Sequence, residues 1–504
     1  MRSTTSAVAW SLAILTSVIG VAILFDASPG INWSIWIAAV SISMIAARRL
    51  QIGIVELPLL LLLAWASLLA AAVAITADES LHFFIILSDA MLLGLATITL
   101  GARDWSSLSA KLLVAVPFLA PLRVAGATAT EAADALKSMP SRRSRSIIKG
   151  ALFSVPLVLV LVALLGTADP VIRWTTERLS GWLPDWSFPP RVLFFALLLT
   201  LSLGANSLAR RQTAAKFPEY PKIGGTWTVG VTEQRMMLWS AAVVLWVFVV
   251  LQVSYLIHPP PAAIGSGITF AEFARRGFGE LSFAVTLVGA IVIVLEYARP
   301  TEATEKDRTG LRRLELALVI ALELILISAF RRVILYEEAY GFTTARLFAQ
   351  TYMIVMGVAL GALALEITRG AISIAFGRRV AEIALAAFTV LVFWNHQAWI
   401  VGKNIDRARE NGKFDSLYSS RLSADAIPTL VERRAEIPQP ARDTLEMRLA
   451  CKTRPEERRW FEWNLRESEA NRALEALKLP PCQVRRGTPL VEPTEKSASS
   501  APAG

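Results

Sequence analysis

The sequence predicts an all-α fold: a polytopic integral membrane helix bundle of about eleven transmembrane helices with a small extracytoplasmic helical C-terminal domain. Composition gives the first support. Of 504 residues, 54% are hydrophobic and only 18% are charged, and the mean hydropathy is +0.50, whereas soluble domains carry about 25% charged residues. The formal net charge of +10 suits basic cytoplasmic loops rather than nucleic-acid binding. We therefore expect the lipid bilayer as a partner and no nucleic acid.

The second observation is the length of the apolar stretches. A bilayer core of about 30 Å needs about 20 apolar residues per helix. A stretch at 112–127 is shorter and contains Pro117, Pro121 and Arg123, which indicates an interfacial or re-entrant segment. The stretches long enough to span are 7–25, 31–47, 54–76, 81–100, 147–168, 191–208, 236–257, 281–298, 314–334, 344–367 and 380–401.

The third observation is the distribution of basic residues, which sets the direction of the spans. With the N-terminus in the cytoplasm, the inner loops carry 24 basic residues, and the outer loops and their flanks carry 8. The remaining 19 lie in the segment from 402 onward, and long segments cross the membrane regardless of charge. The sequence therefore predicts a multi-pass protein with a cytoplasmic N-terminus and an extracytoplasmic C-terminus. The first span is expected to be a retained anchor rather than a cleaved signal peptide.

These spans divide the chain into four regions. Residues 1–146 form an N-terminal membrane region with four spans and a basic cytoplasmic loop that carries the interfacial segment. Residues 147–401 form a membrane core with seven spans, and 402–482 form the extracytoplasmic helical domain. The tail, 483–504, is too poor in apolar residues to fold and is expected to be disordered.

Two helix starts are predicted in the extracytoplasmic domain. Ser423 can cap a helix over "ADAIPTLVERR". Pro455 suits the first turn of a long helix through "EERRWFEWNLRESEANRALEALK". Trp463, Ala470 and Leu474 would share one face of that helix, which is enough to pack a small bundle.

One polar stretch, "LYEEAYGFTTAR" (335–346), lies between the ninth and tenth spans. Gly341 permits a turn, and Thr343 or Thr344 can cap the tenth span. One interpretation is a well-formed turn whose tyrosines anchor at the interface. The other is an outward-facing polar cluster that combines this turn with the loop before the eighth span. The cluster's candidate members are Glu272, Arg275, Arg276, Arg331, Tyr336, Glu337, Tyr340 and Arg346.

Five motifs together resemble a known family. They are "LLGTADP" (164–170), "LQVSYLI" (251–257), "ITFAEFARRGFGEL" (268–281), "LYEEAYGFTTARL" (335–347) and "KNIDRARENGKFDSLYSSRLSADAIPTL" (403–430). The chain resembles the bacterial integral membrane proteins classed as a domain of unknown function, number forty-one seventy-three, with a sister group at forty-one fifty-three. The resemblance covers about residues 147 to 480 and implies a bacterial cytoplasmic (inner) membrane location. It implies no reaction. On the expected topology, all five motifs face out of the cytoplasm.

Two acids fall within apolar spans. Asp89 and Glu323 lie near the middle of the fourth and ninth spans, where an aspartate costs about 2.5–3.5 kcal/mol on insertion scales. They are either a proton relay or protonated partners in interhelical hydrogen bonds. In the tenth span, Gly357 and Gly361 form a GxxxG pattern, which permits close helix contact within the bundle or between protomers of a homo-oligomer.

Histidines and cysteines supply two further candidates. His82, His258 and His396 lie near the outer ends of three spans and are either a shared zinc or pH-sensing site or separate polar groups at the interface. The only two cysteines, Cys451 and Cys482, lie in the segment placed outside, where an oxidising compartment favours a disulfide. The alternative is two free thiols that never meet.

Three function classes remain, in order of preference. The first is a non-enzymatic envelope binding, scaffold or sensing protein whose working surface is extracytoplasmic and meets a protein partner. The second is a proton-coupled or anion transporter or channel that uses Asp89 and Glu323. An enzyme comes third, because the sequence contains no nucleophile–base pair, HExxH motif or glycine-rich phosphate loop. No catalytic residue, metal ligand or cofactor is predicted.

Overall fold

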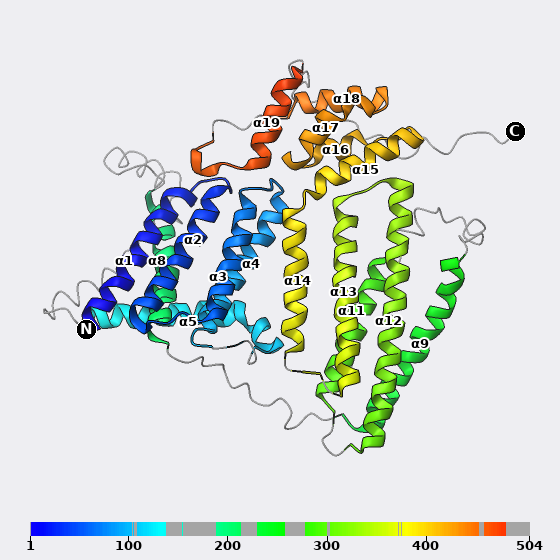
Figure 1. The fold of residues 1–504 in the computed structure, drawn as a ribbon, viewed down its shortest axis with the longest axis horizontal. Coiled ribbons are helices and arrows are strands. Elements are labelled where there is room, and N and C mark those ends of the chain that lie inside the picture. Colours follow the sequence, from blue (N-terminus) through cyan, green and yellow to red (C-terminus); the bar gives the residue numbers. More distant parts are fainter. Residues whose placement is uncertain are drawn as a thin grey trace, which may run out of the picture. The chain divides into compact units, whose positions relative to one another are not determined.

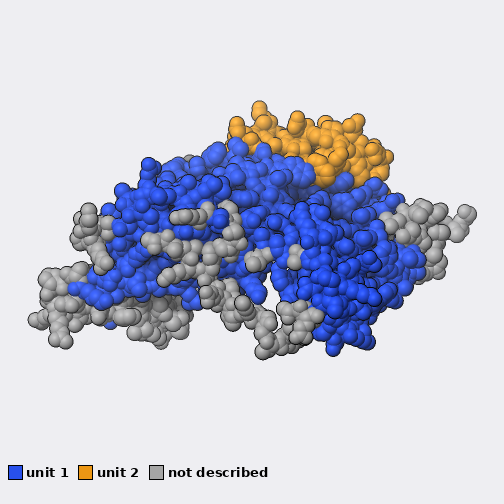
Figure 2. Space-filling view, turned by 60° about the horizontal axis from the view of Figure 1, so that its bottom comes forward, with its two compact units in different colours: residues 1–396, 458–466 blue, residues 397–457, 467–504 orange. Residues whose placement is uncertain are grey.

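The computed structural model contains two compact units (Figure 2). Unit 1 is Met1–His396 together with Arg458–Arg466, and unit 2 is Gln397–Glu457 together with Glu467–Gly504. Every element that the structure describes is a helix. The described residues are 2–102, 104, 108–137, 154, 188–212, 229–257, 278–299, 303–370, 372–373, 375–452 and 458–479.

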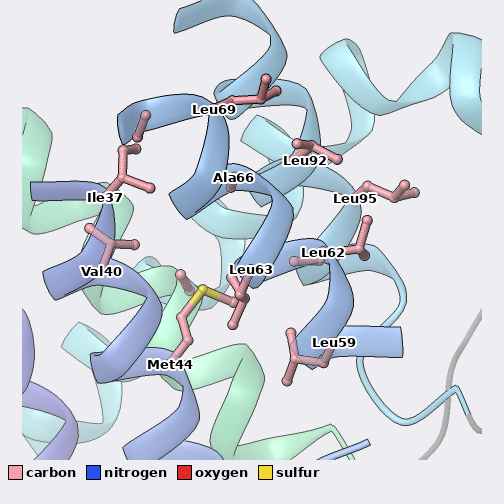
Figure 3. Packing of buried hydrophobic residues seen from close by; sticks show 14 of the residues in the cluster. Ile37, Val40, Met44, Leu59, Leu62, Leu63, Ala66, Leu69, Leu92 and Leu95 are labelled. Atoms are coloured by element: carbon pink, nitrogen blue, oxygen red, sulfur yellow. The ribbon is translucent and has the colours of Figure 1, made fainter. Parts of the chain in front are cut away.

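The first part of unit 1 is a group of six helices around one apolar core. The core is built mainly from leucine and alanine side chains, and Figure 3 shows Met44 lying against Leu63 within it. Long runs of apolar residues with few charges explain why these segments are helical: with no water in a bilayer core, a helix satisfies its own backbone groups. The helices are α1 (Arg2–Leu24), α2 (Ile31–Ile52), α3 (Leu57–Val73), α4 (Glu79–Ile98), α5 (Ala110–Lys137) and α8 (Phe188–Arg211).

A second group of helices packs around its own core, centred on α12. Leu318, Leu322 and Ala329 of α12 are fully buried there. α14 joins the groups, because it packs on α13 and also on α3 and α5, and the indole Nε1 of Trp65 donates to Thr389 Oγ1 at 2.9 Å. The helices are α9 (Val231–Ile257), α11 (Phe278–Tyr297), α12 (Glu305–Tyr340), α13 (Thr344–Arg369) and α14 (Phe376–Phe393).

The helices of unit 1, α5 excepted, run between two ends. We call the end with residues 25–30, 74–78 and 341–343 the upper end, and the end with residues 53–56 and 370 the lower end, as drawn in Figure 1. Helices that follow one another in the chain alternate in direction from α1 to α4 and again from α9 to α14. α5 is the exception, because it runs across the other helices near the lower end.

Nine of the eleven expected spans each fall on one described helix. The span expected at 380–401 coincides with α14 only to Phe393, and its last residues belong to the next helix, which begins at His396. The span expected at 147–168 lies outside the described residues except for residue 154. Among the described helices, eight are long and apolar enough to cross a membrane, and these include α5. α3 has 17 residues, and α12 carries Glu315, Glu323 and Arg331 within its apolar stretch. α5 is longer than the 112–127 segment expected there, at 28 residues despite Pro117 and Pro121. The all-α membrane fold is confirmed.

Unit 2 is a set of short helices around a small core. Its buried side chains include Val401, Ile405, Leu430 and Leu445. Ser423 caps η2 as predicted, because its Oγ accepts a hydrogen bond from the Asp425 backbone at 3.2 Å. The helices that run through it are α15 (His396–Asn411), α16 (Ser416–Arg421), η2 (Ala424–Ala426), α17 (Ile427–Glu432), η3 (Arg434–Glu436), α18 (Gln439–Ala450) and α19 (Leu465–Leu477).

The long C-terminal helix predicted from the sequence is wrong. Residues 458–459 are not helical, η4 (Trp460–Glu462) is a single 3-10 turn, and α19 begins only at Leu465. The reason is tertiary: backbone and side-chain groups of this segment bind loops of unit 1 rather than continuing one helix. Ala470 and Leu474 are buried as expected, whereas Trp463 is 44% exposed. Pro455 lies outside the described residues.

Candidate functional site

The most structured polar region of unit 1 is built on residues 458–466, which we call the strap. Its first turn is self-supporting: Glu462 accepts a hydrogen bond from the backbone of Arg459 at 3.1 Å and pairs with the Arg459 guanidinium. The Glu462 side chain is buried, although it carries a charge. This closed turn fixes the entry of the strap onto unit 1.

The strap binds the α1–α2 loop along its backbone. Glu462 accepts a hydrogen bond from the Ser28 backbone at 3.2 Å, and the carbonyl of Trp463 accepts one from Ile31 at 3.0 Å. At Gly30, an added Cβ would lie 2.7 Å from the backbone of Glu462. Only glycine allows this close approach.

The strap then binds the α3–α4 loop as a short ladder. The Asn464 Nδ2 donates to the carbonyls of Val73 (2.9 Å) and Thr76 (2.7 Å). The backbone of Leu465 donates to Ala74 at 2.8 Å. Asn464 is 2% exposed, so its amide supplies these carbonyls with a donor where water is excluded. The strap therefore fastens two loops of unit 1 that both lie several hundred residues before it in the sequence.

Two of the three candidate histidines lie in the same loop region. Asp78 caps α4 by accepting from Ser80 at 2.9 Å, and His82 Nε2 is 2.7 Å from the Thr76 carbonyl. His396 Nε2 lies 3.6 Å from Asp78 Oδ2. His258 lies outside the described residues. Within the described ranges, no group of three or more His, Cys, Asp or Glu side chains has a geometry that could hold a metal ion.

The 335–346 hairpin forms at the upper end between α12 and α13. Gly341 turns the chain with φ +86°, and Thr343 caps α13. The Arg346 guanidinium lies 4.0 Å from the ring centroid of Tyr336 and donates to the Gly341 carbonyl. Tyr340 stacks beside Tyr336 at 4.9 Å between ring centroids. The arginine therefore links Tyr336 to the turn, and Tyr340 packs beside Tyr336.

The other proposed members of the outer cluster do not all join it. Glu337 is buried and accepts from Gln350 Nε2 at 2.7 Å, inside the α12–α13 contact. Arg331 is exposed on α12. Glu272, Arg275 and Arg276 lie outside the described residues.

Sequence reasoning did not find a second polar contact near the upper end of this helix group. The buried Gln252 side chain accepts from Ser328 Oγ at 3.1 Å and from Arg332 at 2.6 Å. The sequence placed Arg332 in the polar cluster around the 335–346 stretch, but it did not indicate Gln252 as its partner. Only the packing of α9 on α12 brings Arg332 to a buried amide, so no local signal could have indicated the contact.

The two intramembrane acids belong to different helix groups. Asp89 is fully buried in the first group, where its Oδ2 accepts from the Trp33 indole at 2.7 Å. Its Oδ1 has no hydrogen-bond partner among the described residues. Glu323 is half-buried in the second group, with its Oε2 within 3.5 Å of the Cβ position of Gly357. The structure does not bring the two acids into one cluster.

The lower end holds buried ion pairs that the sequence did not single out. Arg48 is 0% exposed, pairs with Glu56 and donates to the Ala209 carbonyl at 3.0 Å. Glu131 is also 0% exposed and accepts from Arg210 at 2.7 Å and from Ser6 at 2.6 Å. Such pairs are costly to break, because each partner would be left as a buried charge. In the sequence, Arg48 is indistinguishable from its exposed neighbour Arg49.

In unit 2, an ion-pair network fixes the helices beside the core. Arg433 pairs with Asp406 and Glu436, both at 2.7 Å, and these carboxylates raise the pKa of Arg433. Cys451 ends α18 and is disulfide-bonded. Cys482, the other cysteine of the chain, lies outside the described residues.

The fold and these sites define a class of protein: a polytopic α-helical integral membrane protein with polar networks at the ends of its spans. Within that class, the family model described as "Domain of unknown function (DUF4153)" matches residues 63–433, which is more than two thirds of the chain. The chain belongs to this family. The family that matches is therefore number forty-one fifty-three, which the sequence indicated only as a sister group, and not number forty-one seventy-three. The match also begins well before residue 147. No curated protein and no solved structure matches the chain.

Proposed function

We propose that the protein is a non-enzymatic scaffold of the bacterial envelope. In this proposal unit 1 is anchored in the inner membrane, its upper end is extracytoplasmic, and unit 2 offers a binding surface to an extracytoplasmic protein partner. The strap is the observation that carries the proposal. The chain passes between the two units three times, and the strap lies between two of these passages.

The orientation is supported by the charges of unit 1. Basic residues are concentrated near the lower end, which the positive-inside rule assigns to the cytoplasm. Near the upper end, the described residues of unit 1 carry Arg191, Arg331, Arg332 and Arg346 on the long helices, and Arg458, Arg459 and Arg466 on the strap. The described basic residues at or near the lower end include Arg48, Arg49, Arg123, Arg210, Arg211, Arg235, Arg299, Arg308, Arg312, Arg313, Arg369, Arg378 and Arg379. The disulfide at Cys451 also supports an oxidising compartment for unit 2.

The strap gives the scaffold its mechanical basis. A domain joined by a single linker would be restrained only by linker length. Here the backbone and buried side chains of 458–466 pair with two loops of unit 1, so the chain that enters and leaves unit 2 is fixed at those points. Transport requires no such fastening. The polar groups that the strap uses are also buried and mutually satisfied rather than arranged around a path for a solute.

A complementation experiment separates the scaffold from a transporter. In a strain that lacks the protein, a strap variant that combines Glu462→Ala and Asn464→Ala should fail to restore the envelope phenotype at normal membrane levels. A variant with Asp89→Asn and Glu323→Gln should restore it fully. A photo-cross-linking residue at Met447, which is 52% exposed on α18, then captures the partner in intact cells, with the fully buried Leu445 as the silent control position. Full function of the strap variant would contradict the scaffold.

One observation favours the second candidate function, a proton-coupled transporter. Asp89 is fully buried and one of its carboxyl oxygens has no partner among the described residues, which suits a group that gains and loses a proton. The transporter predicts proton-coupled flux in proteoliposomes that Asp89→Asn abolishes. The two acids lie in separate cores, so Glu323→Gln should then act independently of Asp89→Asn. Equal flux in wild-type and Asp89→Asn liposomes excludes this candidate.

A further inference from the structure

Both ends of α5 lie against the lower ends of other helices. Its first residue, Ala110, packs directly against Gly377 in the first turn of α14. A side chain at Gly377 would collide with Ala110. Near its other end, Glu131 binds Ser6 in the first turns of α1 and Arg210 at the end of α8. At 1.5 Å per residue, the 28 residues of α5 extend about 42 Å. A helix of that length with both ends at one level does not cross the bundle.

α5 packs against the sides of its neighbours rather than beneath their ends. It meets α4 at Gly94, where an added Cβ would lie 3.0 Å from Ala120, about one turn from the end of α4 at Ile98. It meets α8 at Gly204, where an added Cβ would collide with the Val124 carbonyl, two turns from the end of α8 at Arg211. One to two turns correspond to a depth of about 5–10 Å.

The two faces of α5 differ sharply in burial. Leu112, Val116, Ala120 and Val124 recur every four residues and are buried against the bundle. The opposite face is also apolar over its first half: Val114 is 74% exposed, and Phe118 and Leu122 are each 71% exposed. Exposed apolar side chains in such a row indicate a surface that is covered in the functional protein.

We propose that α5 lies in the plane of the membrane, with Val114, Phe118 and Leu122 inserted among the lipids of the leaflet at the lower end. The depth of its crossings matches that of interfacial helices, whose apolar face is buried about 5–10 Å at the boundary of headgroups and acyl chains. Neighbouring helices carry exposed apolar side chains at the same end: Leu50 is 69% exposed and Leu57 is 64% exposed.

Polar groups at the ends of α5 fit the same placement. Lys111 is exposed in the first turn, and the side chain of Lys137 in the last turn is 78% exposed. Lysines at both ends can reach the headgroups while the row between them remains in the acyl region. α5 is long and apolar enough to span the membrane, but it lies along the membrane surface instead. The reason is that Glu131 fastens its polar second half to the lower ends of α1 and α8. This inference is independent of which end of unit 1 faces the cytoplasm.

Depth measurements at three positions test the proposal. A genetically encoded environment-sensitive fluorescent amino acid replaces Val114, Phe118 or Leu122, one at a time, in the full-length protein. Each variant is reconstituted into phosphatidylcholine–phosphatidylglycerol vesicles that contain lipids spin-labelled near the headgroup, near the top of the acyl chain or near its end. The same probe at the buried Ala120 is the control for quenching that does not depend on lipid contact. All four sites lie on one helix, so thermal melts show which variants remain folded.

An in-plane α5 predicts strong quenching at all three exposed positions, greatest with the label near the top of the acyl chain, and equal depths for the three. The control position should be several-fold less quenched. A spanning helix would instead spread the depths of residues 114 and 122 by about 12 Å, at 1.5 Å per residue, and that result would overturn the proposal. Uniformly weak quenching at all three positions would also overturn it, because the row would then face water or another protein.

Discussion

Asn464 donates its side-chain amide to two backbone carbonyls, those of Val73 and Thr76, and so holds the strap on the α3–α4 loop. Its short, neutral side chain carries two donors on one nitrogen, which no aliphatic residue can replace. Gly30 has the complementary role of leaving room for the strap backbone. At the residue scale, the fastening therefore depends on a few small, buried groups rather than on the exposed charges of the C-terminal segment.

Substitution of Asn464 should destabilise unit 1. Asn464→Ala removes this donor from two buried carbonyls, of which that of Thr76 keeps the His82 ring nitrogen at 2.7 Å. Loss of a hydrogen-bond partner at a buried group costs on the order of 1–3 kcal/mol. Thermal unfolding in detergent should show a lower Tm, and limited proteolysis should cut first within the strap. The matched control is Asn471→Ala on α19, whose side chain makes no hydrogen bond to another of the described residues. Equal Tm values for the two variants would mean that the strap contributes nothing to stability.

The strap should loosen in acid because of Glu462. Burial opposes ionisation of this carboxyl, but hydrogen bonds from Arg459 and from the Ser28 backbone outweigh it and hold the pKa of Glu462 below its ordinary 4.5. A lowered pKa in the folded state means that the stabilisation is complete above pH 4.5 and is lost as the pH falls through the folded-state value. Hydrogen exchange of strap peptides, normalised to the unfolded rate at each pH, should show this loss.

The control for this pH dependence is Glu462→Gln, which cannot ionise. Its strap should be less protected than the wild type at neutral pH and should lack the acid-induced step. If wild-type protection stays constant well below pH 4.5, or if the glutamine variant keeps the step, another group controls the strap.

At the scale of elements, the close crossing of α5 and α8 depends on a residue without a side chain. Gly204→Ala would drive a Cβ into the Val124 carbonyl and force the two helices apart, so we expect a loss of stability of about 1–3 kcal/mol, as for other overpacked sites. Gly126→Ala on the exposed face of α5 meets nothing within 4 Å and should be neutral or stabilising, since alanine is the better helix former by about 1 kcal/mol. Melting curves of the two variants compare them directly.

The sequence predicts the spanning helices well, because apolar length and the absence of charge are local signals. The turn at Gly341 with the Thr343 cap and the start at Ser423 were also predictable, since turn and cap chemistry depends on neighbouring residues. The strap was not. Its sequence "RRWFEWNLR" favours a helix locally, and the carbonyls of Val73 and Ala74 that compete for its donors are almost four hundred residues away.

The buried ion pairs of the lower end escaped prediction for a similar reason. Glu131 lies in the polar second half of α5, whose sequence resembles that of any cytoplasmic loop. Only the packing of α5 on α8 brings Arg210 and Ser207 to it. The candidate acid Asp89 was found because a charge within an apolar span is a local anomaly. Its indole partner Trp33 was not, because α2 and α4 meet only in the folded bundle.

At the scale of the whole molecule, the proposed scaffold rests on one spatial statement: the upper end of unit 1 and all of unit 2 lie outside the cytoplasm. The strap ties the C-terminal chain to the α1–α2 and α3–α4 loops, so these loops and the strap must share one side of the membrane. His396, beside Asp78 at the same end, is where the chain enters unit 2. The location of a single residue in unit 2 therefore tests the orientation of the whole chain.

Cys451 and Cys482 provide that test without mutation, because they are the only cysteines in the chain. Intact cells are treated with a membrane-impermeant maleimide, with and without prior exposure to an impermeant phosphine reductant, and labelling of the protein is then quantified. The scaffold in its proposed orientation predicts no labelling of untreated cells and strong labelling after reduction, with no further gain on permeabilisation. Labelling that appears only after the membrane is permeabilised would place unit 2 in the cytoplasm and contradict the account.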